Sequence, residues 1–475
     1  MLLKKRFFAV ITLLLAMCSL ALAQKLQNLV NQPPDGAGIG LQLTDGTVIF
    51  QGNQQTDWWK LTPDNFGSYV KGTWKQIASL PSGYSPLYFA SAVLADGRVV
   101  IVGGEYNFLQ FVLTNKAAIY DPKADKWTSL GHPKSWPYLG ESPSVVLPDG
   151  KLLVGRKLDK TAAVLDPATL TWTLVGTPGK SDFNAEEGWT LMPDGSILTY
   201  DVKNAPHSER YIPSLAKWVT AGSTIVDLHS PHSGGCIPYP GGCYPAPGEV
   251  GPGLLLTDGT VFATGSGSNG GSGPGHTAIY HPTTKKWTVG PDFPNDDNAG
   301  DSFAALLPNG RPLVLGNSGV LYEFDGKSLI PGPASFGSLM VLPTGQVIVG
   351  GSQVYTSSGT YNPVWAPSIT SYPHTVKRGS SYKLSGKQFN GLSQAAAFGD
   401  EDQTATNYPL VRITNQATHH VFYAKTHDHS TMAVATGNAI VSTHFDVPAK
   451  METGASSLVV VANGIPSKAV SITVN

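Results

Sequence analysis

The stretch ASAVLADGRVVIVGG, residues 90–104, with AAIYDPKADKW at residues 117–127, is the clearest copy of a unit that recurs along the chain. An apolar strand runs into an Asp-Gly turn, and a second apolar strand ends in Gly-Gly. A third strand then ends in Tyr-Asp-Pro, and a Trp-containing segment follows. Asp-Gly or Asn-Gly between two apolar runs is the strongest short-range signal of a β-hairpin. Each unit therefore predicts a small sheet of four antiparallel strands.

Seven such turns follow one another at intervals averaging about 50 residues, the period of kelch repeats. The turns are Asp45-Gly46, Asp96-Gly97, Asp149-Gly150, Asp194-Gly195, Asp258-Gly259, Asn309-Gly310 and Thr344-Gly345. The tryptophan of the fourth strand recurs as Trp74, Trp127, Trp172, Trp218 and Trp287. Four short strands per unit predict an all-β fold, a seven-bladed kelch β-propeller over residues 24–365. An array of β-sandwiches is the alternative.

The composition agrees with many short strands and turns. The 475 residues include 53 Gly and 36 Pro, which interrupt long helices. Hydrophobic residues make up 41% of the chain, which excludes a disordered polar chain. The formal net charge of −1 offers no electrostatic attraction to nucleic acid or to an anionic membrane.

The N-terminal segment has the pattern of a signal peptide. Basic residues 4–6 precede an apolar run over residues 7–20, and Ala-Leu-Ala at residues 21–23 matches a cleavage site. We expect residues 1–23 to be removed and the protein to be secreted, either extracellular or periplasmic. A short membrane anchor and, through Cys18, lipidation are the alternatives. Every later apolar run is too short to span a bilayer.

Two cysteines follow the signal peptide, Cys236 and Cys243, in a loop rich in Gly and Pro. Because exported proteins meet oxidising conditions, we expect a disulfide between them. A zinc site that also uses His229 and His232 is the alternative, although the spacing matches none of the common zinc signatures.

After Tyr355 the repeat ends and short alternating segments take over. SSYKLSG, residues 380–386, and SSLVVVANG, residues 456–464, are examples of this pattern. About 110 residues with turns at short intervals predict an immunoglobulin-like β-sandwich over residues 366–475.

Seven kelch units followed by a small sandwich in an exported chain resemble the galactose oxidase and glyoxal oxidase family. The resemblance covers nearly all of the chain after residue 23 and implies this two-domain fold. It also implies a copper-radical oxidase, in which two tyrosines and two histidines hold copper and one tyrosine is cross-linked to a cysteine. The chain is similar as well to a set of bacterial exported kelch proteins with this sandwich, a resemblance that implies no activity.

The copper ligands of that family carry over only in part. Tyr88, eight residues before a turn aspartate, stands where the cross-linked tyrosine belongs, but residues 36–40 contain no cysteine. Residues 335–343 lack the Tyr-His pair that begins the last unit, whereas His419 matches the final histidine with one extra residue. Copper geometry and radical potential depend on the full ligand set, so the sequence predicts a protein without copper-radical chemistry.

Carboxylates recur at the register of Tyr88, where the start of each innermost strand faces the propeller axis. Five units carry an acidic residue eight to ten residues before the turn: Asp35, Glu141, Glu186, Glu249 and Asp301, with Glu187 beside Glu186. Strand alternation puts the residues at even offsets on one side. Glu187 and Glu249 have odd offsets and need a bulge or a turn to join them.

Three interpretations of this acidic ring remain open. It could hold Ca²⁺ through oxygen ligands. It could supply a general acid and a base or nucleophile for a saccharide. It could simply cap backbone N–H groups. Aromatic residues near the same strand starts favour a saccharide: Tyr84, Tyr88, Phe89, Tyr106, Phe108, Trp136, Tyr138 and Trp189.

We therefore expect a monomeric, exported, galactose-oxidase-like kelch protein that binds or acts on a glycan or small saccharide through an axial acidic pocket. The candidate catalytic residues are Tyr88, Glu141, Glu186 and Asp301. The candidate binding residues are Asp35, Glu187, Glu249 and His419. The alternative is a non-catalytic secreted binding or surface-interaction module with a structural or Ca²⁺-binding acidic ring.

Overall fold

The structure is a computed structural model that describes residues 24–230, 236–239, 242–245, 248–269, 272–398 and 404–475. The predicted signal peptide lies outside these residues. The described chain is all-β, as predicted, apart from short 3₁₀ turns at Pro213–Leu215, Pro294–Asp296 and Pro363–Trp365. A search of the same residues finds no helix with the length and apolar character needed to cross a bilayer.

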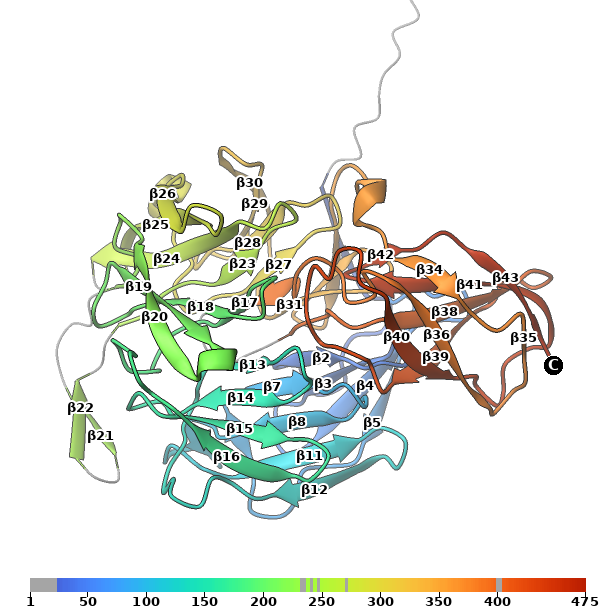
Figure 1. The fold of residues 1–475 in the computed structure, drawn as a ribbon, viewed down its shortest axis with the longest axis horizontal. Helices are drawn as coiled ribbons and strands as arrows, with labels where there is room; N and C mark the ends of the chain where they lie inside the picture. The colour runs from blue at the N-terminus through green and yellow to red at the C-terminus, as the bar shows by residue number, and fades with distance from the viewer. Residues whose placement is uncertain (1–23, 231–235, 240–241, 246–247, 270–271, 399–403) are drawn as a thin grey trace, which may run out of the picture.

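Within the described residues, six sheets have four strands and a seventh has five (Figure 1). The first contains β2 (Gly40–Gln42), β3 (Val48–Gln51), β4 (Trp58–Thr62) and β5 (Thr73–Ile77). The second contains β7 (Ala90–Val93), β8 (Val99–Val102), β11 (Ala117–Asp121) and β12 (Lys126–Leu130). The third contains β13 (Ser144–Val146), β14 (Leu152–Gly155), β15 (Ala162–Asp166) and β16 (Thr171–Val175). The fourth contains β17 (Thr190–Leu191), β18 (Ile197–Tyr200), β19 (His207–Ile212) and β20 (Lys217–Ser223).

The remaining sheets of this series follow the same order. The fifth contains β23 (Gly253–Leu255), β24 (Val261–Asn269), β25 (Ser272–His281) and β26 (Lys286–Val289). The sixth contains β27 (Ala304–Leu306), β28 (Pro312–Leu315), β29 (Val320–Phe324), β30 (Leu329–Ala334) and β37 (Ala396–Ala397). The seventh contains β31 (Leu339–Val341), β32 (Val347–Val349), β33 (Gln353–Thr356) and β1 (Lys25–Asn28).

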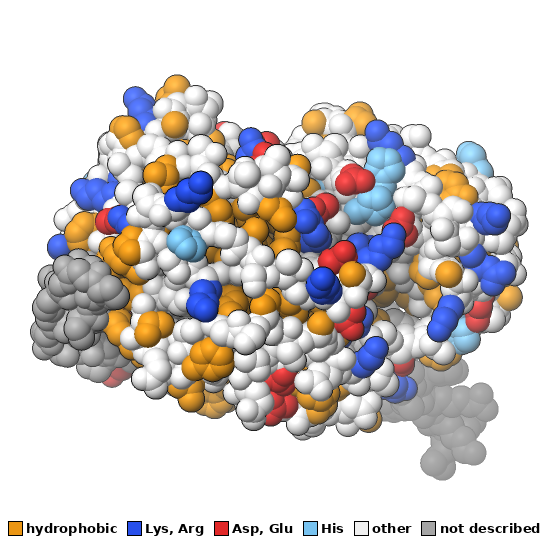
Figure 2. All heavy atoms as spheres, turned by 90° about the horizontal axis from the view of Figure 1, so that it is seen from below, with side chains coloured by type: hydrophobic (Ala, Val, Ile, Leu, Met, Phe, Trp, Pro, Cys, Tyr) orange, Lys and Arg blue, Asp and Glu red, His pale blue; other side chains and the backbone are white. Residues whose placement is uncertain are grey.

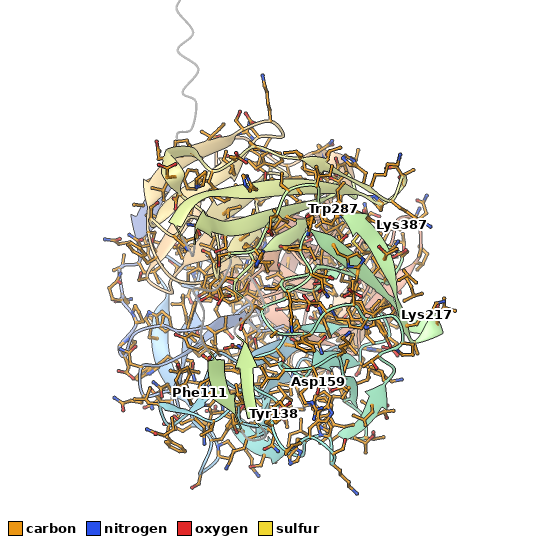
Figure 3. The ribbon with its side chains drawn as sticks, turned by 90° about the vertical axis from the view of Figure 1, so that its left-hand side faces the viewer. Phe111, Tyr138, Asp159, Lys217, Trp287 and Lys387 are labelled. Atoms are coloured by element: carbon orange, nitrogen blue, oxygen red, sulfur yellow. The ribbon has the colours of Figure 1, made fainter. Side chains whose placement is uncertain are left out.

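The first strands of these sheets contact one another. β2 lies beside β7 and β31, β7 beside β13, β17 beside β23, and β27 beside both β23 and β31. The first and last sheets thus meet, and the view in Figure 3 shows the sheets around a common centre. Four-stranded sheets arranged in this way have the architecture of a β-propeller.

The turns that reveal the repeat have one geometry. In the first sheet the N–H of Leu43 donates to the carbonyl of Thr47, and Gly46 N–H donates back to Leu43. The glycine of each turn has φ between 76° and 87°, whereas the Asp or Asn before it does not have positive φ. The loop is thus a three-residue turn with a left-handed glycine. The acid instead accepts the N–H two residues on, as Asp45 does from Thr47 (3.0 Å).

Aromatic pairs between third and fourth strands explain the recurring tryptophan. Tyr120 and Trp127 are cross-strand neighbours with ring centres 5.1 Å apart, and Trp127 also packs on Trp58 of the preceding sheet at 5.2 Å. Trp58 is completely buried. Such rings stabilise both the sheet that carries them and its packing on the neighbouring sheet, because each ring buries a large apolar area.

Two pairings join distant parts of the chain, and the repeat pattern predicts neither. Strand β1 completes the seventh sheet by pairing with β33, with Lys25 opposite Thr356. Strand β37 pairs with β27, with Ala397 opposite Ala304. The first pairing closes the ring with the two ends of the repeat region. The second brings a C-terminal segment to the inner strands.

The C-terminal strands form a further sheet in the order β34–β36–β40–β39–β38–β41–β43–β35, with β42 on β41. They are β34 (Ser368–Ser371), β35 (Thr375–Val376), β36 (Ser381–Lys387), β38 (Leu410–Asn415), β39 (Val421–His427), β40 (Val441–Asp446), β41 (Gly454–Ala462), β42 (Ile465–Pro466) and β43 (Val470–Val474). The sheet has its own core, which includes Leu384, Phe389, Ile413, Phe445 and Leu458. These strands lie to one side of the other sheets (Figure 1).

The segment that carries β37 occupies the centre of the ring. The side-chain oxygen of Gln394 accepts the N–H of Leu191 (3.0 Å), and the Thr404 hydroxyl donates to the carbonyl of Leu339 (3.0 Å). The Tyr408 hydroxyl donates to the carbonyl of Gln42. The inner strands of several sheets therefore hold this segment at the centre of the ring.

Two small sheets complete the described strands. One contains β6 (Pro86–Leu87), β9 (Tyr106–Asn107) and β10 (Gln110–Phe111). The other is the hairpin of β21 (Cys236–Tyr239) and β22 (Gly242–Pro245), in which Cys236 pairs with Pro245 and Cys243 with Pro238. The cysteines are thus diagonal neighbours, and the disulfide stays a prediction. His232, a ligand of the alternative zinc site, lies outside the described residues. Acidic and basic side chains are interspersed on the face shown in Figure 2.

Candidate functional site

Each innermost strand of the ring is preceded by one residue with left-handed backbone. Four of these residues are Gly36, Gly140, Gly248 and Gly337. The other three are Tyr88 (φ 51°), Glu186 (φ 59°) and Asp301 (φ 52°). Left-handed φ costs an L residue about 1 kcal/mol or more, and such residues cluster at functional sites. Three candidate catalytic residues therefore occupy equivalent strained positions, and Glu141 directly follows the glycine of its sheet.

Glu141 and Glu186 meet at a lysine that no sequence pattern identifies. Lys157 lies in the loop between β14 and β15, and only 2% of its side chain is exposed. Its ammonium is 2.7 Å from Oε1 of Glu186 and forms a second ion pair with Glu141. A Cβ on Gly140 would lie 3.2 Å from the Lys157 side chain, so the glycine makes room for the lysine.

Two more carboxyl groups share this electrostatic environment. Desolvation and then the charge of Glu186 raise the pKa of Asp301 to about 6, although Lys157 opposes the shift. Desolvation also raises the pKa of Glu105, with Lys157 again opposing and Glu186 adding. We call Glu105, Glu141, Glu186, Asp301 and Lys157 the Lys157 cluster. Glu105 directly follows the Gly-Gly that ends a second strand, outside the register that the other acids share.

Asp35 and Glu187 lie apart from the Lys157 cluster. The side chain of Asp35 faces Asp57, and burial followed by this contact raises the pKa of Asp57. Glu187 is completely buried and binds Lys180 (2.7 Å) rather than Lys157. Glu186 and Glu187 lie in the loop before β17, where Glu186 has left-handed backbone, and they have different lysine partners.

His419 and Glu249 have different relations to the cluster. His419 is exposed in the turn between β38 and β39. Beside it, Nδ1 of His420 contacts the carboxylate of Glu452, and the N–H of Val421 donates to the carbonyl of Asn65 in the loop after β4. The N–H of Ser230 donates to the carbonyl of Glu249 (2.8 Å), and the N–H of Glu249 donates to the hydroxyl of Ser230 (3.2 Å). The residue after Glu249, Val250, accepts the N–H of Asp301 (3.1 Å), so this segment lines up beside the cluster.

Most of the predicted stacking aromatics belong to the core. Tyr84, Phe89, Trp136, Tyr138 and Trp189 are buried; Tyr138, labelled in Figure 3, packs with Phe111 around Leu113 and Leu158. For these five residues, the prediction of sugar-stacking faces is wrong. Tyr88 and Phe108 remain about half exposed, and the Tyr88 ring lies 6.0 Å from that of Tyr106. The charge of Glu105 raises the pKa of Tyr106, which places this aromatic edge beside the Lys157 cluster.

A cavity of about 200 Å³ opens next to Tyr88. Its lining includes Gly38, Gln51, Tyr88, Phe303 and Ser338. It therefore combines a few polar groups with apolar walls, as small-molecule sites do.

The residues around this cavity show whether the copper site that the family resemblance implies can form. At the register of Tyr88 the seventh sheet carries Phe336 and then Gly337, neither of which can ligate copper through a side chain. A Cβ on Gly337 would lie 2.7 Å from Cα of Gly350, so the backbone leaves no room for a histidine there. With His419 in a distant turn, the residues present do not fit a copper-radical centre.

Comparisons with known proteins find distant similarities. No protein family profile matches the chain. The kelch-like protein terF of Aspergillus terreus is 31% identical over 88 residues, which cover 18% of each chain. The match thus spans less than a fifth of that relative's length.

Three solved structures illustrate the similarity. A fungal alcohol oxidase of the AA5 family in complex with copper is 14% identical, with 95% of this chain and 98% of that chain covered and a TM-score of 0.48. An inactive virginiamycin B lyase from Staphylococcus aureus with quinupristin is 12% identical over 70% of this chain and 98% of that one, with a TM-score of 0.47. The extracellular domain of a putative one-component system from B. thetaiotaomicron is 11% identical, with 95% of this chain and 58% of that chain covered and a TM-score of 0.46. Similarity at this level does not extend to the residues of a site.

Proposed function

We propose that the protein is an exported, galactose-oxidase-like kelch protein that binds a saccharide in its axial acidic pocket and acts on it by acid–base chemistry. In this proposal the seven sheets are the blades of one propeller over residues 24–365, and residues 366–475 form an immunoglobulin-like domain. One observation carries the functional part. Carboxylates from separate sheets, Glu141, Glu186 and Asp301, share the environment of one buried lysine beside half-exposed aromatic rings.

The cluster contains the two kinds of carboxyl group that acid–base chemistry needs. Glu141 and Glu186 form ion pairs with Lys157, and in this proposal they accept the proton from the substrate. Asp301 is exposed toward solvent and has a pKa of about 6, so a fraction of it carries a proton near neutral pH. In this proposal the acids paired with Lys157 take the role of base and Asp301 takes the role of acid.

The rim of the pocket supports a saccharide as the substrate class. Tyr88 and Phe108 expose about half of their surfaces, and Tyr106 lies against Tyr88. Rings with one free face suit the apolar faces of sugar rings, while carboxylates suit the hydroxyl groups. Tyr88 also lines the cavity of about 200 Å³, and in this proposal it orients the substrate.

The second candidate function is a non-catalytic binding or surface-interaction module. The ion pairs of Lys157 favour it, because they compensate part of the acidic charge within the protein itself. The lysine ammonium also occupies the position between Glu141 and Glu186 that Ca²⁺ would need.

A triple variant separates the two functions. We expect Glu141→Gln, Glu186→Gln and Asp301→Asn together to abolish the conversion of neutral oligosaccharides, followed by NMR on a panel of gluco-, galacto- and chito-oligosaccharides. Asp296→Asn is the matched control, because Asp296 is exposed and has the same left-handed backbone (φ 56°).

Conversion that survives the triple change would refute the acid–base assignment. Binding without conversion in the unaltered protein would establish the binding module instead. We also expect no hydrogen peroxide from primary alcohols after loading with Cu²⁺.

A further inference from the structure

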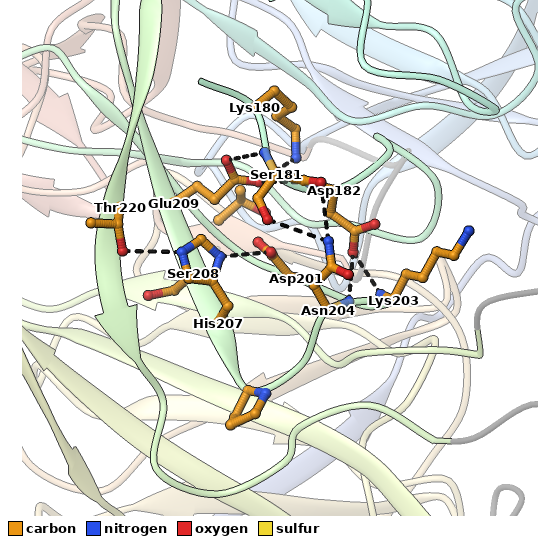
Figure 4. Close-up of polar contacts among 12 residues, drawn as sticks. Lys180, Ser181, Asp182, Asp201, Lys203, Asn204, His207, Ser208, Glu209 and Thr220 are labelled. Atoms are coloured by element: carbon orange, nitrogen blue, oxygen red, sulfur yellow. Dashed lines mark hydrogen bonds and ion pairs between the residues drawn. The ribbon is translucent and has the colours of Figure 1, made fainter. Parts of the chain in front are cut away.

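A second group of buried acids lies in the fourth sheet, at the end where β17 begins (Figure 4). It contains Asp182, Glu187, Asp201 and Glu209, each at most 2% exposed, and a completely buried Lys180 side chain. We call these five residues the Lys180 cluster. Four carboxyl groups face one ammonium in a region that excludes water, so the cluster holds more acid than its lysine can neutralise.

The lysine serves only part of the cluster. Its Nζ donates to both carboxylate oxygens of Glu187 (2.7 and 3.0 Å) and to Oε1 of Glu209 (2.9 Å). The N–H of Ser181 donates to Oε2 of Glu209 (2.6 Å). Asp182 accepts backbone N–H groups, including that of Lys203 (2.6 Å). These contacts account for Glu187, Glu209 and Asp182, and none of them reaches Asp201.

Asp201 is the buried acid with an unused oxygen. Its Oδ2 lies 2.7 Å from Nδ1 of His207, and its side chain is completely buried. Its Oδ1 is buried too, and no described residue forms a hydrogen bond with it. A buried carboxylate oxygen without a partner calls for a proton or a cation.

We infer that Asp201, His207 and Glu209 form a binding site for one divalent transition metal ion of the zinc class. One ligand atom from each residue lies within 4.8 Å of the other two. An imidazole nitrogen with two carboxylate oxygens is a donor set that suits Zn²⁺, whereas Ca²⁺ prefers oxygen ligands alone. A divalent ion would also reduce the excess negative charge of the Lys180 cluster.

The surroundings of the histidine fit this role. His207 begins β19 and its side chain is 34% exposed, so an ion can reach the site from solvent. Its Nε2 lies 3.0 Å from the hydroxyl of Thr220 in β20, as Figure 4 shows. A contact at the second ring nitrogen fixes the orientation of a ligating imidazole. The ion would tie the residue after β18, Asp201, to His207 and Glu209 of β19.

The test is titration of the mature, untagged chain with Zn²⁺ after treatment with a chelator. We expect one equivalent to bind, a rise in melting temperature, and visible d–d bands when Co²⁺ replaces Zn²⁺. Asp201→Asn and His207→Gln should each weaken binding at least about tenfold. His276→Gln is the matched control, since His276 forms an exposed pair with Asp292 (2.8 Å) elsewhere, and it should bind as the unaltered protein does.

The absence of saturable Zn²⁺ binding would overturn the inference, and would show that a proton on Asp201 or His207 supplies the missing charge. Zn²⁺ binding by Asp201→Asn and His207→Gln that is as tight as that of the unaltered protein would also overturn it. If those variants do not fold, anomalous scattering at the zinc edge from crystals of the unaltered protein decides. A peak between Asp201, His207 and Glu209 supports the site, and a peak elsewhere or no peak refutes it.

Discussion

The Lys157 and Lys180 clusters begin from consecutive residues, Glu186 and Glu187, yet they differ in access to solvent. The Lys157 partners Glu141 and Glu186 expose 8% and 10% of their side chains, and Asp301 opens the cluster to solvent. The Lys180 partners Glu187 and Glu209 expose 0% and 1%. Tyr88, about half exposed, packs on Tyr106, the residue that follows Glu105 of the first cluster.

The difference shows that the same residue types serve different ends when burial differs. An acid that can reach water can also exchange protons with a substrate, so the open cluster suits chemistry. A fully buried acid must keep a partner, because an uncompensated charge there costs several kcal/mol. The closed cluster therefore suits structure and the binding of an ion.

The largest expected effect comes from removing each lysine. Lys180→Met leaves Glu187 and Glu209 buried without their cation and should lower the free energy of unfolding by about 3–5 kcal/mol. Lys157→Met should cost about 1–3 kcal/mol, since its partners reach water more easily. Urea unfolding of both variants measures the difference.

Arg98→Met is the control for that comparison, because the Arg98–Asp96 pair is about one-quarter to one-third exposed and should contribute no more than about 1 kcal/mol. An equal or larger loss in Lys157→Met than in Lys180→Met would contradict the contrast between an open and a closed cluster.

A medium effect is expected from pH acting on Asp301. Its pKa rises on folding, so the stability that it contributes is present below its ordinary pKa and is lost as pH rises through about 6. Asp301→Asn should therefore gain stability relative to the unaltered protein between about pH 4 and about pH 7, by about 1 kcal/mol after solvent screening. Unfolding curves at several pH values check this, and a difference that stays constant with pH would refute the raised pKa.

The smallest effect on stability is expected at the aromatic rim. Phe108→Ala should change the free energy of unfolding by no more than about 0.5 kcal/mol, because the ring is half exposed. It should nevertheless weaken saccharide binding, measured by calorimetry. Phe66→Ala, which removes an exposed ring that packs on His420 far from the cluster, should leave binding unchanged. Equal effects of Phe108→Ala and Phe66→Ala on saccharide binding would show that the aromatic rim is not part of the binding site.

Local sequence patterns are enough to recognise the repeat. The Asp-Gly turns and the tryptophans of the fourth strands depend on contacts within a hairpin, such as that of Tyr120 with Trp127. The register of Glu141, Glu186 and Asp301 is visible in the sequence for the same reason, since the distance from turn to strand start is short. The roles of these acids remain a proposal.

Long-range burial decides the features that local patterns do not predict. Lys157 and Glu105 lie outside the register that the acids share, and only the ring brings them to Glu186. Nothing in the order of residues distinguishes Lys180 from an exposed lysine. The positions of Tyr84, Trp136 and Trp189 in the core likewise depend on neighbouring sheets.

The sequence by itself thus determined the hairpins, the repeat and the height at which acids recur, because these follow from interactions between residues close in the chain. Only the tertiary structure decided which acids share a lysine and which aromatic rings stay exposed. It also decided that Asp201 keeps a buried oxygen to which no described residue donates a hydrogen bond. These properties depend on desolvation by segments that are distant in sequence, which no local pattern records.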